Sequence, residues 1–210
     1  MNDLKVPVGI SDFAKIQNYG YYYVDKTGLI ADLLEKETAE VTFITRPRRF
    51  GKTMGMSMLA NFFDIRKDSQ AMFEGLEISK NTALCSEWMN QWPVLFVSFK
   101  DIDGLTFASA KGMLLERLAN LFKAHRYLAL SDRVDPDDAK IFKKLSDLVN
   151  GHPTDAMLKT AISLLMQMMR DHYGKPVILL IDEYDVPIAK ASAKGYYPEM
   201  LEVIKGLMST

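Results

Sequence analysis

The sequence predicts an α/β fold in which a parallel sheet lies between helical layers, a three-layer sandwich. Short apolar, β-branched stretches alternate with segments of helical spacing, a Gly-Lys-Thr tripeptide follows one of these stretches, and acidic residues follow another. Strands separated by helices pair in parallel and are covered by those helices. A chain of 210 residues is long enough for one such domain.

The N-terminal part, residues 1–40, is predicted to form an arm and a helix that pack on the main domain, residues 41–210. The first 25 residues mix turn formers with tyrosines and show no helical period, so we expect an irregular arm that packs by its rings. The segment 26–37 has apolar residues at helical spacing, with Thr27 as a candidate N-cap.

Three short stretches are predicted to be strands: Val41 to Thr45, Val94 to Phe99 and Val177 to Ile181. The last is apolar throughout, which is typical of a strand buried on both faces. These strands would form the parallel sheet.

Five further helices are predicted from apolar spacing and from start and stop residues. The best bounded has Asp135 as N-cap, Pro136 in its first turn and Gly151 just past its end. The others begin near Lys52 or span Phe107 to Tyr127, Thr154 to His172 and Pro198 to Met208.

The segment Arg46 to Thr53, RPRRFGKT, ends in the Gly-Lys-Ser/Thr signature of a phosphate-binding loop (Walker A). An expected strand precedes it and an expected helix follows, so backbone N–H groups and the positive helix end point at one place. Gly51 would let the backbone approach phosphate, Lys52 would reach the β and γ oxygens, and Thr53 would ligate magnesium. The alternative interpretation is a basic surface turn.

The full set of candidate nucleotide-binding residues is Arg46, Pro47, Arg48, Arg49, Phe50, Gly51, Lys52, Thr53 and Asp182. Arg46 stands where the usual pattern has its first glycine, next to Pro47, so standard loop dihedrals are not expected. Arg48 and Arg49 either contact phosphate oxygens or remain in solvent or in ion pairs.

The stretch Val177 to Ile181 leads directly into Asp182 and Glu183, the form of a Walker B strand. A carboxylate at the carboxyl end of a parallel strand lies where ligands of open α/β sheets bind. Asp182 would hold magnesium, and Glu183 would act as the general base on an attacking water. A solvated acidic turn is the alternative, but two such motifs in one chain support each other and predict a P-loop NTPase.

Four segments resemble the AAA-ATPase-like family of bacterial P-loop proteins: PVGISDF at 7–13, YYVDKT at 22–27, ITRPRRFGKT at 44–53 and LLIDEYDVP at 179–187. The resemblance covers nearly the whole chain. It implies ATP rather than GTP, magnesium, and a glutamate beside the Walker B aspartate. It also implies that longer relatives carry a C-terminal domain similar to PD-(D/E)XK nucleases. The match at Asp25 to Thr27 would place these residues near the nucleotide base or at the cap of the next helix.

The resemblance further implies a domain truncated after the Walker B strand and one helix. In this class the following strand lies between the two motif strands and carries a polar sensor residue, whereas this sequence ends at Thr210. We therefore expect a homo-oligomer or a partner chain to complete the sheet, because buried strand edges need hydrogen-bond partners. Nucleotide binding is better supported than hydrolysis.

Composition narrows the remaining functions. A net charge of −1, from 26 basic and 27 acidic residues, gives no general attraction to nucleic acid. A single cysteine, no leader-like start and no apolar run of about 20 residues predict a cytoplasmic protein without a membrane partner. Three functions remain: a magnesium-dependent ATPase that drives conformational change in an attached or partner domain, a nucleotide-binding switch without turnover, and a small-molecule phosphotransferase.

Overall fold

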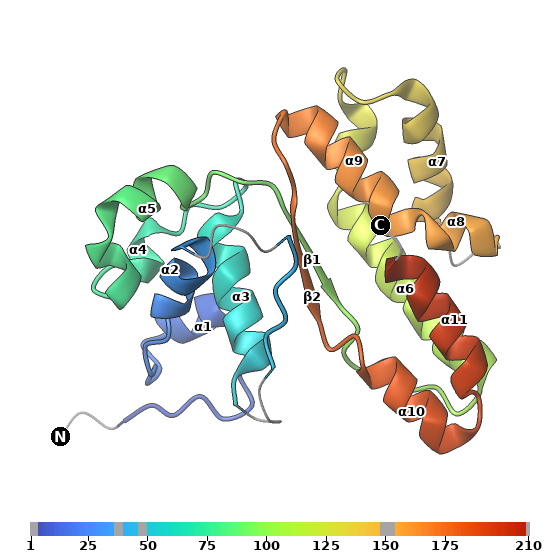
Figure 1. Ribbon diagram of the computed structural model, residues 1–210, viewed down its shortest axis with the longest axis horizontal. Helices are drawn as coiled ribbons and strands as arrows, with labels where there is room; N and C mark the ends of the chain where they lie inside the picture. Colours follow the sequence, from blue (N-terminus) through green and yellow to red (C-terminus); the bar gives the residue numbers. More distant parts are fainter. Residues whose placement is uncertain (1–3, 36–39, 46–49, 148–153, 209–210) are drawn as a thin grey trace. The chain divides into compact units, whose positions relative to one another are not determined.

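The computed structural model describes residues 4–35, 40–45, 50–147 and 154–208 (Figure 1). The chain divides into two compact units, unit 1 (Met1–Val94) and unit 2 (Leu95–Thr210). The division that we predicted at residue 40 remains a prediction.

Unit 1 is built from short helices. Its elements are α1 (Phe13–Asn18), α2 (Gly28–Glu35), α3 (Lys52–Phe63), α4 (Gln70–Phe73), the 3-10 helix η1 (Glu77–Lys80) and α5 (Thr82–Trp88). α1 packs against α3 and α4, and η1 packs against α2 and α5. The helices predicted from residue 26 and near Lys52 are confirmed as α2 and α3. α1 lies within the arm that we expected to be irregular.

Aromatic rings form the core of unit 1. Phe13, Phe62 and Phe73 are fully buried, and the Phe73 ring centroid lies 5.0 Å from that of Phe13 and 5.3 Å from that of Phe62. The backbone N–H of Phe13 donates to the Ser57 hydroxyl at 3.0 Å. This core and this hydrogen bond hold α1 on α3.

The predicted strand from Val41 to Thr45 is not formed, and that prediction was wrong. Described residues 40–45 have irregular backbone, and the side chains of Val41 and Phe43 are 68% and 74% exposed. β-branched composition favours a strand only where a neighbouring strand takes up its backbone hydrogen bonds. Residues 40–45 have no such neighbour in the described structure.

Unit 2 combines two strands with a set of helices. Its elements are β1 (Val94–Ser98, beginning at the unit boundary), α6 (Phe107–Ala124), the 3-10 helix η2 (Arg126–Leu130), α7 (Pro136–Ser146), α8 (Asp155–Lys159), α9 (Ala161–Tyr173), β2 (Ile178–Asp182), α10 (Val186–Lys194) and α11 (Tyr197–Met208). β1 and β2 are neighbours and run parallel (Figure 1). A mostly helical structure with a small parallel sheet is compatible with the α/β class, and the parallel pairing and the positions of β1 and β2 are confirmed. The described residues form a two-stranded sheet, so the three-layer sandwich remains a prediction.

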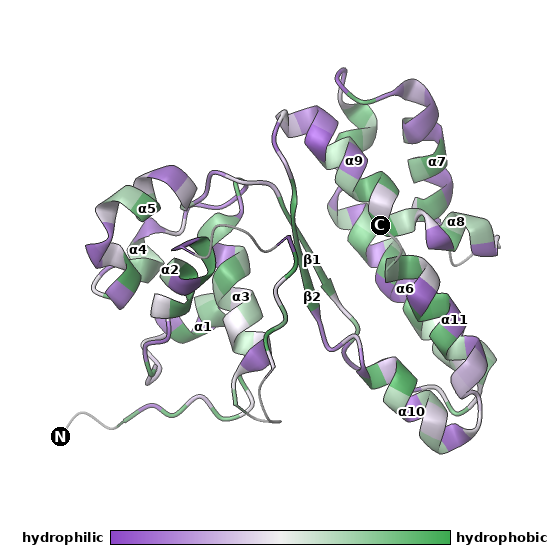
Figure 2. Cartoon of the chain, in the orientation of Figure 1, coloured by the Kyte–Doolittle hydropathy of each residue, from purple (hydrophilic) through white to green (hydrophobic). Residues whose placement is uncertain are grey.

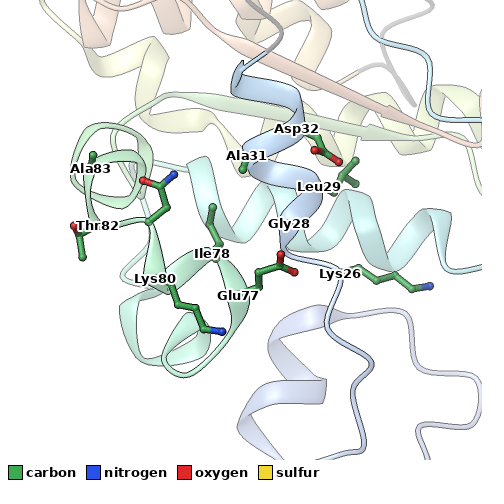
Figure 3. A pocket seen from close by; sticks show the side chains of 11 residues that line it. Lys26, Gly28, Leu29, Ala31, Asp32, Glu77, Ile78, Lys80, Thr82 and Ala83 are labelled. Atoms are coloured by element: carbon green, nitrogen blue, oxygen red, sulfur yellow. The ribbon is translucent and has the colours of Figure 1, made fainter.

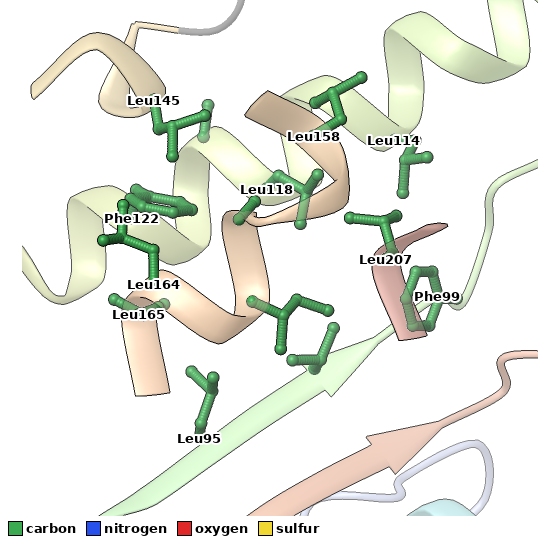
Figure 4. Packing of buried hydrophobic residues seen from close by; sticks show 14 of the residues in the cluster. Leu95, Phe99, Leu114, Leu118, Phe122, Leu145, Leu158, Leu164, Leu165 and Leu207 are labelled. Carbon is green, nitrogen blue, oxygen red and sulfur yellow. The ribbon is translucent and has the colours of Figure 1, made fainter. Parts of the chain in front are cut away.

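One apolar core joins the strands of unit 2 to its helices. Leu95, Val97 and Phe99 alternate along the chain and therefore point to one face of β1, where they pack with leucines of α6, α9 and α11 (Figure 4). Figure 2 shows that both strands are hydrophobic along most of their length. The sheet is thus fixed by its burial against the helices.

Two helical predictions in unit 2 need correction. The helix expected from Thr154 is broken at Thr160 into α8 and α9, and Gly174, with φ +66°, ends α9 close to the expected end at His172. Two helices rather than one follow β2, because the small residues of α10 hide its helical period. Asp135 and Pro136 start α7 as predicted, while Gly151 lies outside the described residues.

No helix in the described ranges combines the length and the apolar composition that crossing a bilayer requires.

Candidate nucleotide-binding site

The phosphate-binding candidates of unit 1 lie where the chain enters α3. Gly51 is the N-cap residue and has left-handed backbone, φ 79° and ψ 26°, which glycine adopts without steric cost. Its carbonyl accepts a hydrogen bond from Gly55 N–H at 2.9 Å. Gly51 has no side chain to cap the helix, and the first turn of α3 contains no acidic residue. The start of α3 therefore presents backbone N–H groups and the positive end of the helix dipole.

Lys52 and Thr53 are the first two residues of α3, and both are half-buried. The other half of the helix is anchored in the aromatic core through Met58 and Phe62. The exposed ring of Phe50 precedes the turn. Arg46 to Arg49 lie outside the described residues, so their part in the site remains a prediction.

Lys26 lies at the same turn, and the sequence reasoning missed it as a site residue. A Cβ built on Gly51 would be 3.8 Å from the Lys26 Nζ atom. The segment YYVDKT at 22–27 was the available signal, because it is among the segments that resemble the family. That resemblance did not indicate which side chain of the segment faces the loop.

The residues on either side of Lys26 are fixed by hydrogen bonds to η1. The Asp25 carboxylate accepts from Thr27 N–H at 2.8 Å, from the Thr27 hydroxyl at 2.7 Å and from Glu77 N–H at 2.7 Å. The Thr27 hydroxyl accepts from Ile78 N–H at 3.1 Å, and Thr27 is fully buried. The hydrogen bonds of Thr27 thus tie the segment to η1, and they set the starting point of the Lys26 side chain.

These contacts also set the charge of Asp25. Partial burial raises the pKa of its carboxyl, but the hydrogen bonds from Thr27 and Glu77, together with the charge of Lys80, lower it further than burial raises it. The net result is a pKa below the ordinary value of 3.8. Asp25 is therefore an anion at neutral pH, and its carboxylate holds this segment in place through the hydrogen bonds that it accepts.

A pocket of about 790 Å³ opens in unit 1 beside α2, η1 and the start of α5 (Figure 3). Its charged lining residues are Lys26, Asp32, Glu77 and Lys80. A Cβ on Gly28 would lie 3.0 Å from the Glu77 Oε2 atom, so glycine there lets the carboxylate approach the start of α2. The two carboxylates offset the two lysines of the pocket, whereas the first turn of α3 has no carboxylate, so the start of α3 is the better anion site of unit 1.

The acidic candidates lie at the carboxyl end of β2 in unit 2. Asp182 is the last residue of the strand, and its carbonyl accepts a hydrogen bond from Phe99 N–H at 3.0 Å. Leu179 and Ile181 pack against the helical core, so the alternation of side chains places Asp182 on the opposite face of β2. Its side chain is buried, with 3% of its surface exposed.

Glu183 has an uncommon backbone conformation. Its φ of +54° is in the left-handed region, which costs a residue with a Cβ about 1–2 kcal/mol. Its carbonyl accepts from Val186 N–H at 3.1 Å in the turn that leads into α10. Such a strained conformation persists only where the surrounding structure holds it, and strained residues are common at functional sites. The conformation re-aims the half-buried Glu183 side chain just beyond the strand.

Gly51, Lys52 and Thr53 thus belong to unit 1, whereas Asp182 and Glu183 belong to unit 2. That the two groups bind one nucleotide remains a prediction.

Comparison with known proteins gives a family match over most of the chain. The model of a family described as predicted AAA-ATPase matches residues 7–210. A protein of Azotobacter chroococcum mcd 1, described as an uncharacterized protein in the vnfD 5′ region, is 40% identical over 100 residues. Those residues are 47% of this chain and 18% of the Azotobacter protein, so the match spans less than a fifth of that relative. No solved structure matches the chain significantly.

Proposed function

Because the chain belongs to the predicted AAA-ATPase family, we propose that it is a magnesium-dependent module that binds and hydrolyses ATP. Hydrolysis would drive a conformational change in an attached or partner domain. The observation that carries the proposal is the left-handed Gly51 at the start of α3, followed at once by Lys52 and Thr53. A glycine turn, backbone N–H groups at a helix start and an adjacent lysine together suit phosphate oxygens.

In this proposal the residues of unit 1 bind the nucleotide. Backbone N–H groups of the α3 turn donate to phosphate oxygens, and the Lys52 ammonium stabilises the negative charge that they carry. Arg48 and Arg49 belong to the same loop and are proposed to add bidentate contacts. Each of these interactions contributes to affinity.

The residues of unit 2 are proposed to support hydrolysis. The Glu183 carboxylate accepts a proton from the attacking water. Magnesium needs few protein ligands because phosphates and waters complete its shell, and the Thr53 hydroxyl and the Asp182 carboxylate are oxygen donors of the required kind. When bound, the ion would offset the charge of the phosphates.

A nucleotide-binding switch without turnover is the second candidate. It needs only the residues of unit 1 that are proposed to bind the nucleotide. Binding at the α3 turn of unit 1 therefore does not by itself involve the proposed general base.

Thermal unfolding with and without Mg-ATP tests the binding step. At 100 times Kd the ligand adds about 2.7 kcal/mol, which raises Tm by roughly 5–10 °C for a chain of this size. We expect this rise for the wild type and its loss in Lys52→Ala. Lys80→Ala removes a lysine of the same unit at η1 and should keep the rise. A wild type without any rise at millimolar Mg-ATP would overturn the proposal.

Phosphate release separates the two candidates. We expect Glu183→Gln to release phosphate at least about 100-fold more slowly than the wild type while its Kd for Mg-ATP changes less than about threefold. Asp185→Asn alters a neighbouring exposed acid and should leave both quantities unchanged. Equal release by Glu183→Gln and wild type would exclude the general-base role. Binding without release in the wild type would establish the switch.

A further inference from the structure

The position of Lys26 is not explained by the fold of unit 1. Its neighbours Asp25 and Thr27 are tied to η1 by hydrogen bonds, whereas the Lys26 side chain is exposed. Within the described ranges no acidic side chain forms an ion pair with it. Figure 3 shows it extending away from Glu77 and Lys80. Its ammonium lies beside Gly51 instead.

This placement concentrates positive charge. The Lys26 ammonium, the start of α3 and the adjacent Lys52 lie around one glycine turn, and the first turn of α3 has no carboxylate to offset them. Like charges destabilise one another, and an exposed lysine is free to adopt other rotamers. An anion at the turn would convert this repulsion into attraction.

We propose that Lys26 is a second phosphate-binding lysine, whose ammonium contacts a phosphate oxygen of the nucleotide bound at the α3 turn. This inference rests on the proposed function, because it assigns a further residue to the same site. The hydrogen bonds of Asp25 and Thr27 fix the backbone on both sides of Lys26, so only the side chain must be ordered on binding. Lys26 is then a recognition residue for the polyphosphate and not for the base.

Binding titrations of four variants test this role against Mg-ATP and against magnesium tripolyphosphate, which lacks the base and the ribose. The variants are Lys26→Gln, Lys26→Arg, Lys80→Gln and Lys52→Ala. A hydrogen bond to a charged group contributes a factor of about 10 or more to affinity. We expect Lys26→Gln to raise Kd about 10-fold for both ligands, and Lys26→Arg to stay within about threefold of the wild type.

The control Lys80→Gln makes the same charge change in the same unit, at η1, and should alter Kd less than about twofold. An equal effect of Lys26→Gln and Lys80→Gln, with Lys52→Ala still defective, would overturn the role of Lys26 and leave the ATP site standing. A loss confined to Mg-ATP would also overturn it, because Lys26 would then contact the nucleoside. A wild type that binds neither ligand would overturn both the role of Lys26 and the proposed function.

Unfolding without ligand shows whether the variants fold. Lys26 is exposed, so we expect Lys26→Gln and the wild type to have the same Tm in the absence of nucleotide.

Discussion

The two units hold their candidate residues by different means. In unit 1, Gly51 and Lys26 lie on irregular chain that is fixed by a left-handed turn and by hydrogen bonds to η1. In unit 2, Asp182 closes a regular strand whose other face packs on a core of aliphatic side chains. Both cores contain aromatic pairs, such as Phe62 with Phe73 in unit 1 and Phe122 with Phe142 in unit 2.

The difference predicts where each unit is sensitive to substitution. A residue carried by loops depends on single hydrogen bonds and on one or two ring contacts, whereas a residue carried by a strand depends on the packing behind the sheet. Unit 1 should therefore be sensitive to the loss of a single ring or hydrogen bond, and unit 2 to bulk added behind its strands.

The largest effect is expected from the aromatic core of unit 1. Phe62 is fully buried and makes edge-to-face contacts with Phe63 and Phe73. Phe62→Ala should lower the free energy of unfolding by about 4 kcal/mol, because it removes a buried ring and leaves a cavity. Hydrogen exchange of α1 and α3 amides would measure this loss.

Phe43→Ala is the matched control for this substitution. The Phe43 side chain is 74% exposed, so its removal should change stability by less than about 0.5 kcal/mol. Similar losses in the two variants would show that unit 1 does not depend on its buried rings.

A steric effect of about 3 kcal/mol is expected in unit 2. A Cβ on Gly104 would lie 2.1 Å from the backbone N of Ala110, at the start of α6, and backbone cannot give way cheaply. Gly104→Ala should therefore destabilise unit 2 by overpacking, as urea unfolding would show. Gly112→Ala lies within α6 with nothing inside 4 Å, and should stabilise by about 0.5–1 kcal/mol. Equal effects of the two alanines would contradict the close approach at Gly104.

Local signals were enough to predict much of unit 2. Asp135 and Pro136 form a cap that depends only on neighbours in sequence, and the apolar run of β2 reads as a buried strand without knowledge of its partner. α10 was missed because its alanines and lysines give weak apolar contrast. Asp185, the N-cap of α10, follows a turn in which Glu183 has left-handed backbone. The residue types in this segment do not predict that turn.

Unit 1 was harder to predict because its contacts are distant in sequence. Asp25 and Thr27 bond to Glu77 and Ile78, about 50 residues further along the chain, and such pairs leave no periodic pattern. The motif residues Gly51, Lys52 and Thr53 were identified by type and spacing alone. Lys26 was not, because its place beside Gly51 follows from that long-range network.

The smallest effect, and the one that tests the polar network of unit 1, is expected at Asp25. The Asp25 carboxylate accepts hydrogen bonds from Thr27 N–H and from Glu77 N–H. In Asp25→Asn an amide replaces this carboxylate, so one acceptor oxygen is lost and the remaining contacts weaken with the loss of charge. We expect a loss of about 1 kcal/mol at pH 7, a modest value because solvent screens this partly exposed group. Asp32→Asn, an exposed neighbour, should be neutral.

The pH dependence of this loss follows from the lowered pKa of Asp25. A carboxyl whose folded pKa lies below its unfolded value of 3.8 binds fewer protons when folded, so its stabilisation is complete above that value. The stabilisation is lost as the pH falls through the folded pKa. Urea unfolding should therefore show a difference between wild type and Asp25→Asn that is constant from pH 7 to about pH 5. The difference should shrink below about pH 4, and a difference independent of pH down to about pH 2 would mean that Asp25 stabilises unit 1 by its shape and not by its charge.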